Sequence, residues 1–221
     1  MTFIDSWIDW SPTLLRGLWL SVRITFFSLL LGLPLGMVLA LVATAKRTWL
    51  RRLAIAAVEI GRALPAIVVL QLFYYGLPST GLTLTSMVAA TAALGLTTAA
   101  YSSEILRGGI NAVPHGSIEA SAALAVSPLY TLWFVTLPQA LRIALVPLLG
   151  FAILIFQATS LCTTIAVPEL LSQAYSIGSS TFDYLSVLVL AGVMYAVITI
   201  PSSWLVVMAE GRMSRHLRPV T

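Results

Sequence analysis

Charged residues are scarce in this chain of 221 residues: 9% are Asp, Glu, Lys or Arg, against roughly 25% in soluble domains. Hydrophobic residues make up 59% of the sequence, and its mean hydropathy is +0.97. One small core cannot bury so much apolar surface, so membrane lipid must solvate a large part of it. The composition therefore predicts one all-α integral membrane domain over residues 1–221, with no separate soluble domain.

Three further absences exclude classes of function. The chain contains no G-x-x-x-x-G-K-[ST] sequence, so it cannot itself be a P-loop ATPase. Its single cysteine, Cys162, excludes an intrachain disulfide, and we interpret it as a small buried apolar residue. The histidines, His115 and His216, lie far apart, and no metal-ligand or nucleophile–base cluster accompanies them. A membrane enzyme and a metal site are therefore disfavoured.

The formal net charge of +4 does not indicate nucleic-acid binding, because the Lys and Arg residues are scattered between hydrophobic runs. The N-terminus carries Asp5 and Asp9 and has no basic region before an apolar stretch, so we expect no cleavable signal peptide. Residues 1–22 are predicted to form an external and interfacial segment. Within it, 12–22 would be an interfacial helix with tryptophans at the level of the lipid headgroups.

The uncharged windows of the sequence predict five membrane spans. A spanning helix needs about 20 apolar residues. The windows at 24–45, 143–168 and 184–209 hold one span each. The longer window at 63–103 holds two spans, divided by a Gly- and Pro-containing turn signal at 76–81.

The distribution of positive charge predicts the topology. With five spans, ten of the twelve Lys and Arg residues fall on one face, which the positive-inside rule makes cytoplasmic. A sixth span at 120–141 would place the basic C-terminus outside, and Pro128 and Pro138 interrupt that window. We therefore predict an external N-terminus, a cytoplasmic segment at 104–142 and a cytoplasmic tail at 210–221.

The segment from Glu119 to Pro138 has the most specific pattern, EASAALAVSPLYTLWFVTLP. It resembles the EAA loop of the permease subunits of ABC importers, whose pattern is E-A-A, three residues, G, nine residues, I, one residue and L-P. Glu119, Ala120, Leu137 and Pro138 match that pattern at the right spacing. The departures from it are Ser121, Ala125 and Val135.

Other segments resemble the polar amino acid branch of this family, which includes histidine, glutamine and arginine permeases. YSSEILRGGINAVP at 101–114 is similar to its AEIxRGGIxxVPxGQ run, and PQALRIALVP at 138–147 to its PQALRIALPPL run. Shorter matches are RALP at 62–65 and VPELL at 167–171. The resemblance covers nearly the whole chain in order. It implies the type I ABC importer permease fold, with a cytoplasmic coupling helix, in a bacterial cytoplasmic (inner) membrane.

The resemblance also implies a function and a set of partners. The chain would be a non-catalytic translocation subunit that couples ATP hydrolysis elsewhere to uptake of an amino acid or a similar solute. Its partners would be two ABC ATPase subunits, a second permease subunit (this chain or a paralogue) and an extracytoplasmic solute-binding protein. The ATPase subunits would bind ATP and Mg, and this chain would hold no cofactor.

The alternative function is a stand-alone secondary transporter or channel that couples to protons through Glu59 or Glu104. It does not account for an alanine-rich cytoplasmic helix. Ion pairs of Glu59 with Arg62, and of Glu104 with Arg107, are the simpler interpretation of these acidic residues.

Physical features of the cytoplasmic segment agree with a docking role. We predict a helix over 117–124, with Ser117 as its N-cap and Glu119 in its first turn, where negative charge favours the helix dipole. Its alanines favour the helix and leave a slim surface for close approach of another protein. The resemblance implies that Glu119 pairs with a basic residue of the ATPase. The predicted ATPase-coupling residues are Glu119, Ala120, Ser121, Ala122, Leu124, Ala125, Val126, Ser127 and Pro128.

Two turn geometries are open at Ala125, which stands where the family pattern has glycine. A left-handed cap with positive φ would cost alanine about 1 kcal/mol. A different turn would avoid that cost. In that different turn, Ser127 and Pro128 would start the next helix.

Polar side chains inside the spans are candidates for a substrate pathway, because lipid penalises them. Each could instead bond to a neighbouring helix. The predicted pathway residues are Gln71, Tyr74, Thr98, Gln157, Thr159 and Ser160. Many members of the resembled branch read KDTSL where this chain reads QATSL at 157–161. The sequence leaves open whether this change marks one half of a heterodimer or an atypical substrate.

Overall fold

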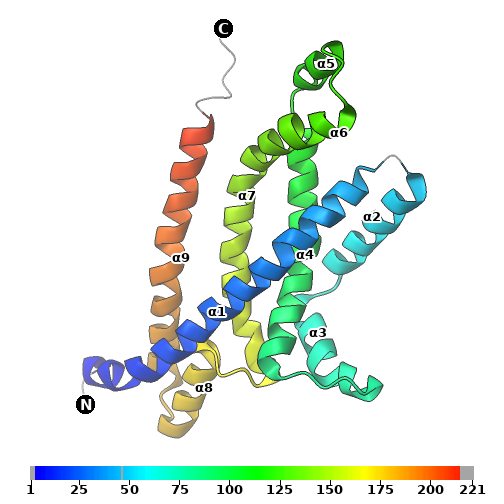
Figure 1. The fold of residues 1–221 in the computed structure, drawn as a ribbon. Helices are drawn as coiled ribbons and strands as arrows, with labels where there is room; N and C mark the ends of the chain where they lie inside the picture. The colour runs from blue at the N-terminus through cyan, green and yellow to red at the C-terminus, as the bar shows by residue number, and fades with distance from the viewer. Residues whose placement is uncertain (1–2, 46, 215–221) are drawn as a thin grey trace.

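The computed structural model describes residues 3–45 and 47–214, and every regular element in these ranges is helical, as predicted. Figure 1 shows the start of α1 at one end of the molecule, with α5 and the last turns of α9 at the other. The α-helices are α1 Phe3–Ala43, α2 Thr48–Ala63, α3 Ala66–Gln71, α4 Ser86–Asn111, α5 His115–Ala123, α6 Pro128–Thr131, α7 Leu137–Ala158, α8 Leu170–Thr181 and α9 Tyr184–Ser214. The π turns are η1 Leu72–Gly76 and η3 Leu132–Thr136, and the 3-10 turns are η2 Leu77–Thr80 and η4 Thr159–Ile165.

Helix α1 is continuous over 41 residues, so the predicted interfacial helix at 12–22 is not separate from the first span. Pro12 and Pro34 lie inside the helix without ending it. At 1.5 Å per residue, α1 is about 60 Å long, roughly twice the thickness of the hydrocarbon layer. Figure 1 shows how this length is accommodated: α1 runs obliquely across the other helices.

The second predicted span starts at a sharp bend. The chain bends by 96° between α2 and the helical run 66–80. Leu64 adopts an extended conformation there, because the following Pro65 disfavours helical geometry in the residue before it. The loop predicted to follow the first span is therefore mostly the helix α2, which carries Arg51, Arg52 and Arg62; Lys46 lies outside the described residues. The helical run ends at Gly81, whose φ is +88°, at the end of the predicted turn signal.

Helix α4 forms the centre of the bundle, with one long side buried. Gly32 and Gly36 of α1 lie directly on Thr98 and Ser102 of α4, leaving no room for a Cβ atom at either glycine. Small residues permit this close crossing of two helices within a membrane. By length and apolarity, three helical stretches of the described chain qualify as spans, or four with the bent α2–α3 pair, and α4 is not among them. Because protein surrounds much of α4, its sequence is less apolar than that of a lipid-facing helix.

The fourth predicted span, 143–168, starts inside a longer helix. Residues Pro128–Ile165 form one apolar helical run of 38 residues, made of α6, η3, α7 and η4. The window 120–141 is not one separate helix, because it begins with the end of α5 and its second half is continuous with the following span. The predicted cytoplasmic tail at 210–221 is also partly helical, since α9 continues to Ser214.

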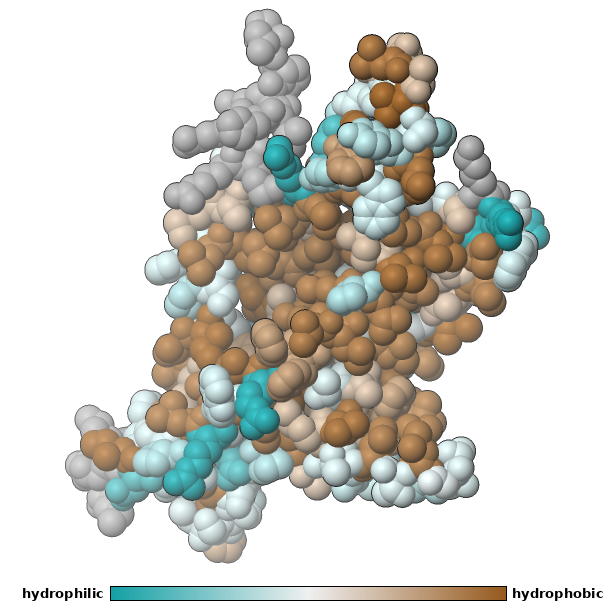
Figure 2. All heavy atoms as spheres, viewed as in Figure 1, coloured by the Kyte–Doolittle hydropathy of each residue, from teal (hydrophilic) through white to brown (hydrophobic). Residues whose placement is uncertain are grey.

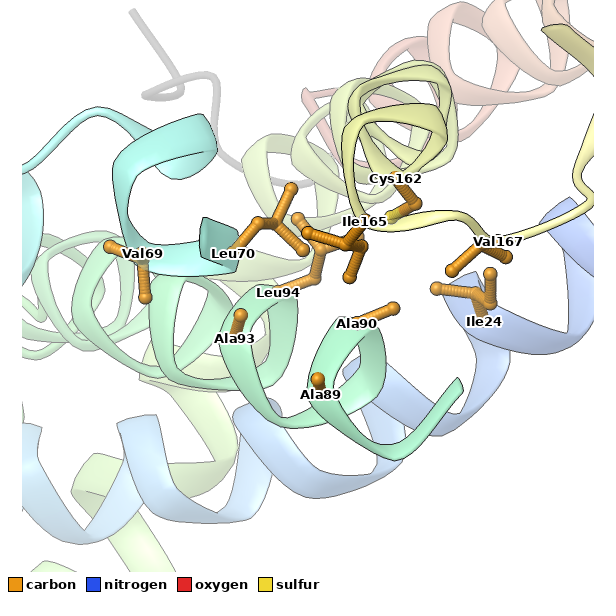
Figure 3. Packing of buried hydrophobic residues seen from close by; sticks show 10 residues of the cluster. All are labelled: Ile24, Val69, Leu70, Ala89, Ala90, Ala93, Leu94, Cys162, Ile165 and Val167. Atoms are coloured by element: carbon orange, nitrogen blue, oxygen red, sulfur yellow. The ribbon is translucent and has the colours of Figure 1, made fainter. Parts of the chain in front are cut away.

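Two cores of buried residues lie near the end of the molecule where α1 begins. Figure 3 shows Leu70 of α3, Leu94 of α4 and Ile165 of η4 pointing toward one another, with Ile24 of α1 beside Val167. The second core joins α1, α8 and α9. In Figure 2, apolar residues cover the middle of the visible face and hydrophilic residues gather toward its ends, which fits a multi-pass membrane protein.

Candidate coupling surface and substrate pathway

The predicted coupling helix is α5, but it starts earlier than expected. It runs from His115 to Ala123 with Pro114 at the N-cap position, so Ser117 lies inside the helix. The Ser117 N–H donates to the Pro114 carbonyl at 3.0 Å. The expectation that Ser117 caps the helix is therefore wrong. Glu119 lies in the second turn, beyond the first-turn position predicted for it.

The turn after α5 has the left-handed geometry, because the φ of Ala125 is +57°. The Val126 N–H donates to the Ser121 carbonyl and the Ala125 N–H to the Ala122 carbonyl, both at 3.0 Å. These two bonds form a Schellman cap, which usually has glycine at the left-handed position. They satisfy backbone carbonyls at the end of α5 and offset the cost of about 1 kcal/mol for alanine in this conformation.

The start of the next helix is as predicted. Pro128 is the first residue of α6, and the Ser127 hydroxyl accepts a hydrogen bond from the Tyr130 N–H at 3.4 Å. The short link between α5 and α6 is therefore capped on both sides. This makes the α5–α6 element a defined shape rather than a loose loop.

The α5–α6 element protrudes beyond the ends of α4 and α7 (Figure 1) and presents apolar side chains. Leu124 is 79% exposed and Leu129 66% exposed. Ser121 is the exception among the predicted coupling residues, because it is buried and its hydroxyl donates to the Ser117 carbonyl at 2.9 Å. The other predicted coupling residues, Glu119, Ala120, Ala122, Leu124, Ala125, Val126, Ser127 and Pro128, are exposed or half-buried. An exposed apolar tip of this kind is typical of a protein interface.

An ionic cluster ties α2 to α4. The Arg107 guanidinium donates to both oxygens of Glu104, at 3.0 and 2.7 Å, which confirms the predicted pair. Arg62 lies 3.6 Å from Glu104, so the expected pair of Arg62 with Glu59 is wrong. The bend at Leu64 carries the end of α2 onto α4, and this turns Arg62 toward Glu104. Hydrogen bonds from Arg107 hold the pKa of Glu104 below its usual value, although partial burial opposes them.

Four of the six predicted pathway residues come from two segments that pack together. The run α3–η1 carries Gln71 and Tyr74, and it packs against η4 beside Gln157 and Ser160. The hydroxyl of Tyr75, next to Tyr74, donates to a carbonyl of η4 at 3.2 Å. Gln71 and Gln157 are exposed, and Tyr74 and Ser160 are half-buried. The fold thus brings together the two segments that carry these four residues, called here the α3–η4 cluster.

The remaining two predicted pathway residues are fully buried. The Thr98 hydroxyl donates to the Leu94 carbonyl of its own helix at 2.7 Å, and its side chain packs under Gly32. The Thr159 hydroxyl donates to the Phe156 carbonyl at 2.7 Å. In this conformation neither side chain presents surface to a solute.

A cavity of about 410 Å³ opens between α1, α7 and α9. Its lining is almost entirely apolar, with residues such as Phe26, Ile153 and Leu205, and none of the six predicted pathway residues lines it. This cavity is therefore distinct from the α3–η4 cluster. Within the described residues no group of three His, Cys, Asp or Glu side chains could hold a metal ion.

Glu169 is a site residue that the sequence did not reveal. It belongs to the VPELL segment at 167–171, and its side chain has no exposed surface. Glu169 caps α8, accepting from the Leu171 and Ser172 N–H groups. Burial raises the pKa of its carboxyl, and the hydrogen bonds oppose that effect. The one sequence signal was an acidic residue directly before an apolar helix start, which indicates a cap but not burial.

Comparison with known proteins places this geometry in a family. Residues 32–215 match the family described as "Binding-protein-dependent transport system inner membrane component". The probable amino-acid ABC transporter permease protein YckA of Bacillus subtilis (strain 168) is 34% identical over 188 residues, covering 85% of this chain and 83% of the relative. The arginine transport system permease protein ArtQ of the same organism is 33% identical over 190 residues, covering 86% and 87%.

The fold agrees with that relationship. The crystal structure of an amino acid ABC transporter with histidines has a TM-score of 0.90 to this chain at 28% identity. The match covers 96% of this chain and 99% of the other. The helices therefore have the type I ABC permease fold, and the chain belongs to the family of binding-protein-dependent transport system inner membrane components.

Proposed function

We propose that this chain is the translocation subunit of an ATP-driven importer for an amino acid or an amino-acid-like solute. The observation that carries the proposal is the protruding, doubly capped α5–α6 element at the position of the EAA loop. Such an element needs a soluble partner to cover its apolar tip. A stand-alone secondary transporter or channel does not require such an element, and family membership does not support that alternative function.

The connections of α5 suggest how motion would be transmitted. Three residues join α5 to α4, and the turn at Ala125 joins it to the α6–α7 run. Gly109 of α4 packs against the Ala140 carbonyl and the Ala144 side chain of α7, so the two helices touch near their α5 ends. A displacement of α5 by a closing ATPase would therefore move α4 and α7 together. Tight packing favours such rigid-body motion.

The proposed topology has five spans: α1, the bent α2–α3 pair, α4, the α7 run and α9. The N-terminus would be external, and α5 with the end of α9 cytoplasmic, in the inner membrane of a bacterium. The charge distribution supports this orientation, because the five-span topology assigns ten of the twelve Lys and Arg residues to the cytoplasmic face. The α3–η4 cluster would then form part of the pathway at the external end.

The proposed assembly contains two ATPase subunits, which bind ATP and Mg, a second permease subunit and an extracytoplasmic solute-binding protein. The exposed positions of Gln71 and Gln157 support a second permease subunit, because one chain leaves both side chains unenclosed. Ala158 lies next to Gln157, so this chain offers the solute amide chemistry where many relatives offer a Lys–Asp pair. This chain itself would be non-catalytic.

Purification of the detergent-solubilised complex from its native host, followed by uptake assays, tests the proposal. We expect an ABC ATPase to co-purify, together with ATP-dependent uptake of a radiolabelled amino acid once the complex is in proteoliposomes with its binding protein. Recovery of one permease species or of two would separate a homodimer from a heterodimer. Transport in vesicles without ATP would contradict the proposal and favour a secondary transporter.

A further inference from the structure

Glu169 sits at a junction of helices near the end of the molecule where α1 begins. The Ser172 N–H donates to its Oε1 at 2.8 Å, and the Leu171 N–H donates to its Oε2 at 2.9 Å. Two hydroxyls reach the same Oε2: that of Tyr195 from α9 at 3.1 Å and that of Ser21 from α1 at 3.5 Å. One carboxylate therefore contacts three helices.

Capping of α8 does not by itself explain this arrangement. An exposed Asp, Asn or Ser would satisfy the same two N–H groups, without the cost of burying a charge. In the part of the chain that the structure describes, no basic side chain forms an ion pair with Glu169 to offset that cost. Compared with an exposed cap, the buried position gives Glu169 two additional contacts, with the hydroxyls of Tyr195 and Ser21.

The junction also reaches the candidate pathway. The Tyr195 ring packs edge-on against Phe156 of α7, with 5.3 Å between the ring centroids. The Phe156 carbonyl accepts the hydrogen bond from the Thr159 hydroxyl of η4, and η4 also carries Ser160. Gly17 of α1 packs onto the backbone of Glu169 so closely that a Cβ atom at Gly17 would have no room. Two apolar cores flank the junction: η4 belongs to one, α8 and α9 to the other, and α1 contributes to both.

We propose that Glu169 is a positioning residue for transport, and this inference rests on the proposed function. Its Oε2 ties the start of α8 to α1 and α9, and only four residues separate η4 from α8, so that the external wall of the pathway moves as one body. When the link is cut, η4 moves independently of α1 and α9. ATP hydrolysis then continues, but less of it is converted into solute uptake.

The variant Glu169→Asp separates this role from helix capping. Aspartate is a preferred N-cap residue, so the bonds to the α8 N–H groups are kept. Its side chain is one methylene shorter, so the carboxylate withdraws from Tyr195. Tyr195→Phe cuts the same link from the other side and leaves the cap untouched. Ser186→Ala is the control, because it removes the 3.0 Å bond from Trp7 that also joins α1 to α9 without touching Glu169.

The first measurement is uptake and ATP hydrolysis by the complete complex in proteoliposomes. We expect Glu169→Asp and Tyr195→Phe each to lower uptake per ATP about tenfold, the ratio that corresponds to one hydrogen bond to a charged group. The double variant should be no worse than the stronger single variant. Subunit assembly and the Ser186→Ala variant should match the parent. Parental uptake per ATP in Glu169→Asp would overturn the inference.

The second measurement uses Cys162, the sole cysteine of this chain, which is fully buried in η4. Maleimide labelling of the complex, with the Cys162 peptide quantified by mass spectrometry, reports the opening of η4. We expect both link variants to label about tenfold faster than the parent, again the ratio for one such hydrogen bond. Equal acceleration by Ser186→Ala, or parental rates in both link variants, would overturn the inference.

These outcomes also distinguish a failure of the role proposed for Glu169 from a failure of the proposed transport function. If the parent complex takes up no amino acid, the proposed function fails, while the labelling comparison can still be made. If the parent transports normally and Glu169→Asp matches it in uptake per ATP and in labelling, the inference alone fails.

Discussion

At the scale of single residues, the α5–α6 element combines an exposed acidic side chain with a strained turn. Glu119 is exposed in the second turn of α5, and Ala125 holds a positive φ that glycine would adopt more easily. The first residue belongs to the proposed contact with the ATPase and the second to the shape of the element. The two roles predict different effects of substitution.

Reversal of the charge at Glu119 should uncouple transport. In Glu119→Lys we expect the ATPase to bind the permease at least about tenfold more weakly, because a charge pair across the interface becomes a repulsion. The protein should still insert in the membrane. Co-purification of the ATPase with the variant measures the effect. Glu59→Lys is the matched control, since Glu59 is also exposed but lies on α2. Normal ATPase recovery with Glu119→Lys would remove Glu119 from the coupling surface.

Glycine at position 125 should stabilise the element. Ala125→Gly relieves the left-handed strain, worth about 1 kcal/mol, whereas Ala122→Gly inside α5 should cost about the same amount. Hydrogen exchange of the α5 amides should therefore slow in the first variant and quicken in the second. If hydrogen exchange slowed in both variants, or quickened in both, the left-handed turn at Ala125 would be contradicted.

At the scale of elements, small residues and one ionic cluster decide how the helices cross. Gly32 and Gly36 bring α1 onto α4, and Arg62 and Arg107 meet Glu104 where α2 reaches α4. The first contact is buried and depends on shape. The second is partly exposed and depends on charge, so it should respond to pH.

A methyl group at Gly32 should loosen the crossing of α1 and α4. Gly32→Ala places a Cβ against Thr98 and the Gly95 carbonyl, and overpacking of this kind costs about 1–3 kcal/mol. We expect a lower thermal midpoint for the detergent-solubilised protein. At Gly192 of α9 a Cβ meets nothing within 4 Å, so Gly192→Ala should be neutral or slightly stabilising. Equal losses in the two variants would argue against a close crossing.

The ionic cluster should lose its contribution on acidification. The pKa of Glu104 is lowered in the folded protein, so its stabilisation is present above the ordinary glutamate pKa. It is lost as pH falls through the lowered folded value. Because the side chains of Arg107 and Glu104 are 38% and 24% exposed, we expect about 1 kcal/mol or less. Glu104→Gln should reduce the change in thermal midpoint between pH 7 and acidic pH, and an unchanged pH dependence would contradict this role.

At the scale of the whole molecule, the proposed topology places α5 and the end of α9 on one side of the membrane. Figure 1 shows these two elements at the same end, opposite the start of α1. An odd number of spans is required for this arrangement. The five-span count therefore depends on treating α4 and the bent α2–α3 pair as one span each.

A reporter fusion tests that count directly. A reporter fused at His216, which lies outside the described residues, should read cytoplasmic, and one fused before α1 should read external. The physical reason is the excess of Lys and Arg on the α5 side. An external reading at His216 would restore an even number of spans and the rejected sixth span at 120–141.

The sequence by itself determined the helical membrane class, the family and the position of the α5–α6 element. These follow from local properties: apolar composition, the spacing of the EAA pattern and the capping preference of Ser127 and Pro128. At Ala125 the sequence limited the turn to two geometries, because alanine adopts a positive φ only at a cost. The structure shows which of the two is present. The start of α5 was missed by two residues, because Pro114 ends the preceding turn and Ser117 is not needed as a cap.

Only the tertiary structure decided the partners of the ionisable side chains and the burial of α4. Arg62 meets Glu104 rather than Glu59 because the bend before Pro65 carries the end of α2 onto α4. Helix α4 is less apolar than the spans α1, α7 and α9 because protein, not lipid, surrounds much of it. Glu169 is buried because Ser21, 148 positions away in the sequence, and Tyr195 close around it. Contacts between segments this far apart depend on how the helices pack, and that packing cannot be predicted from local hydropathy.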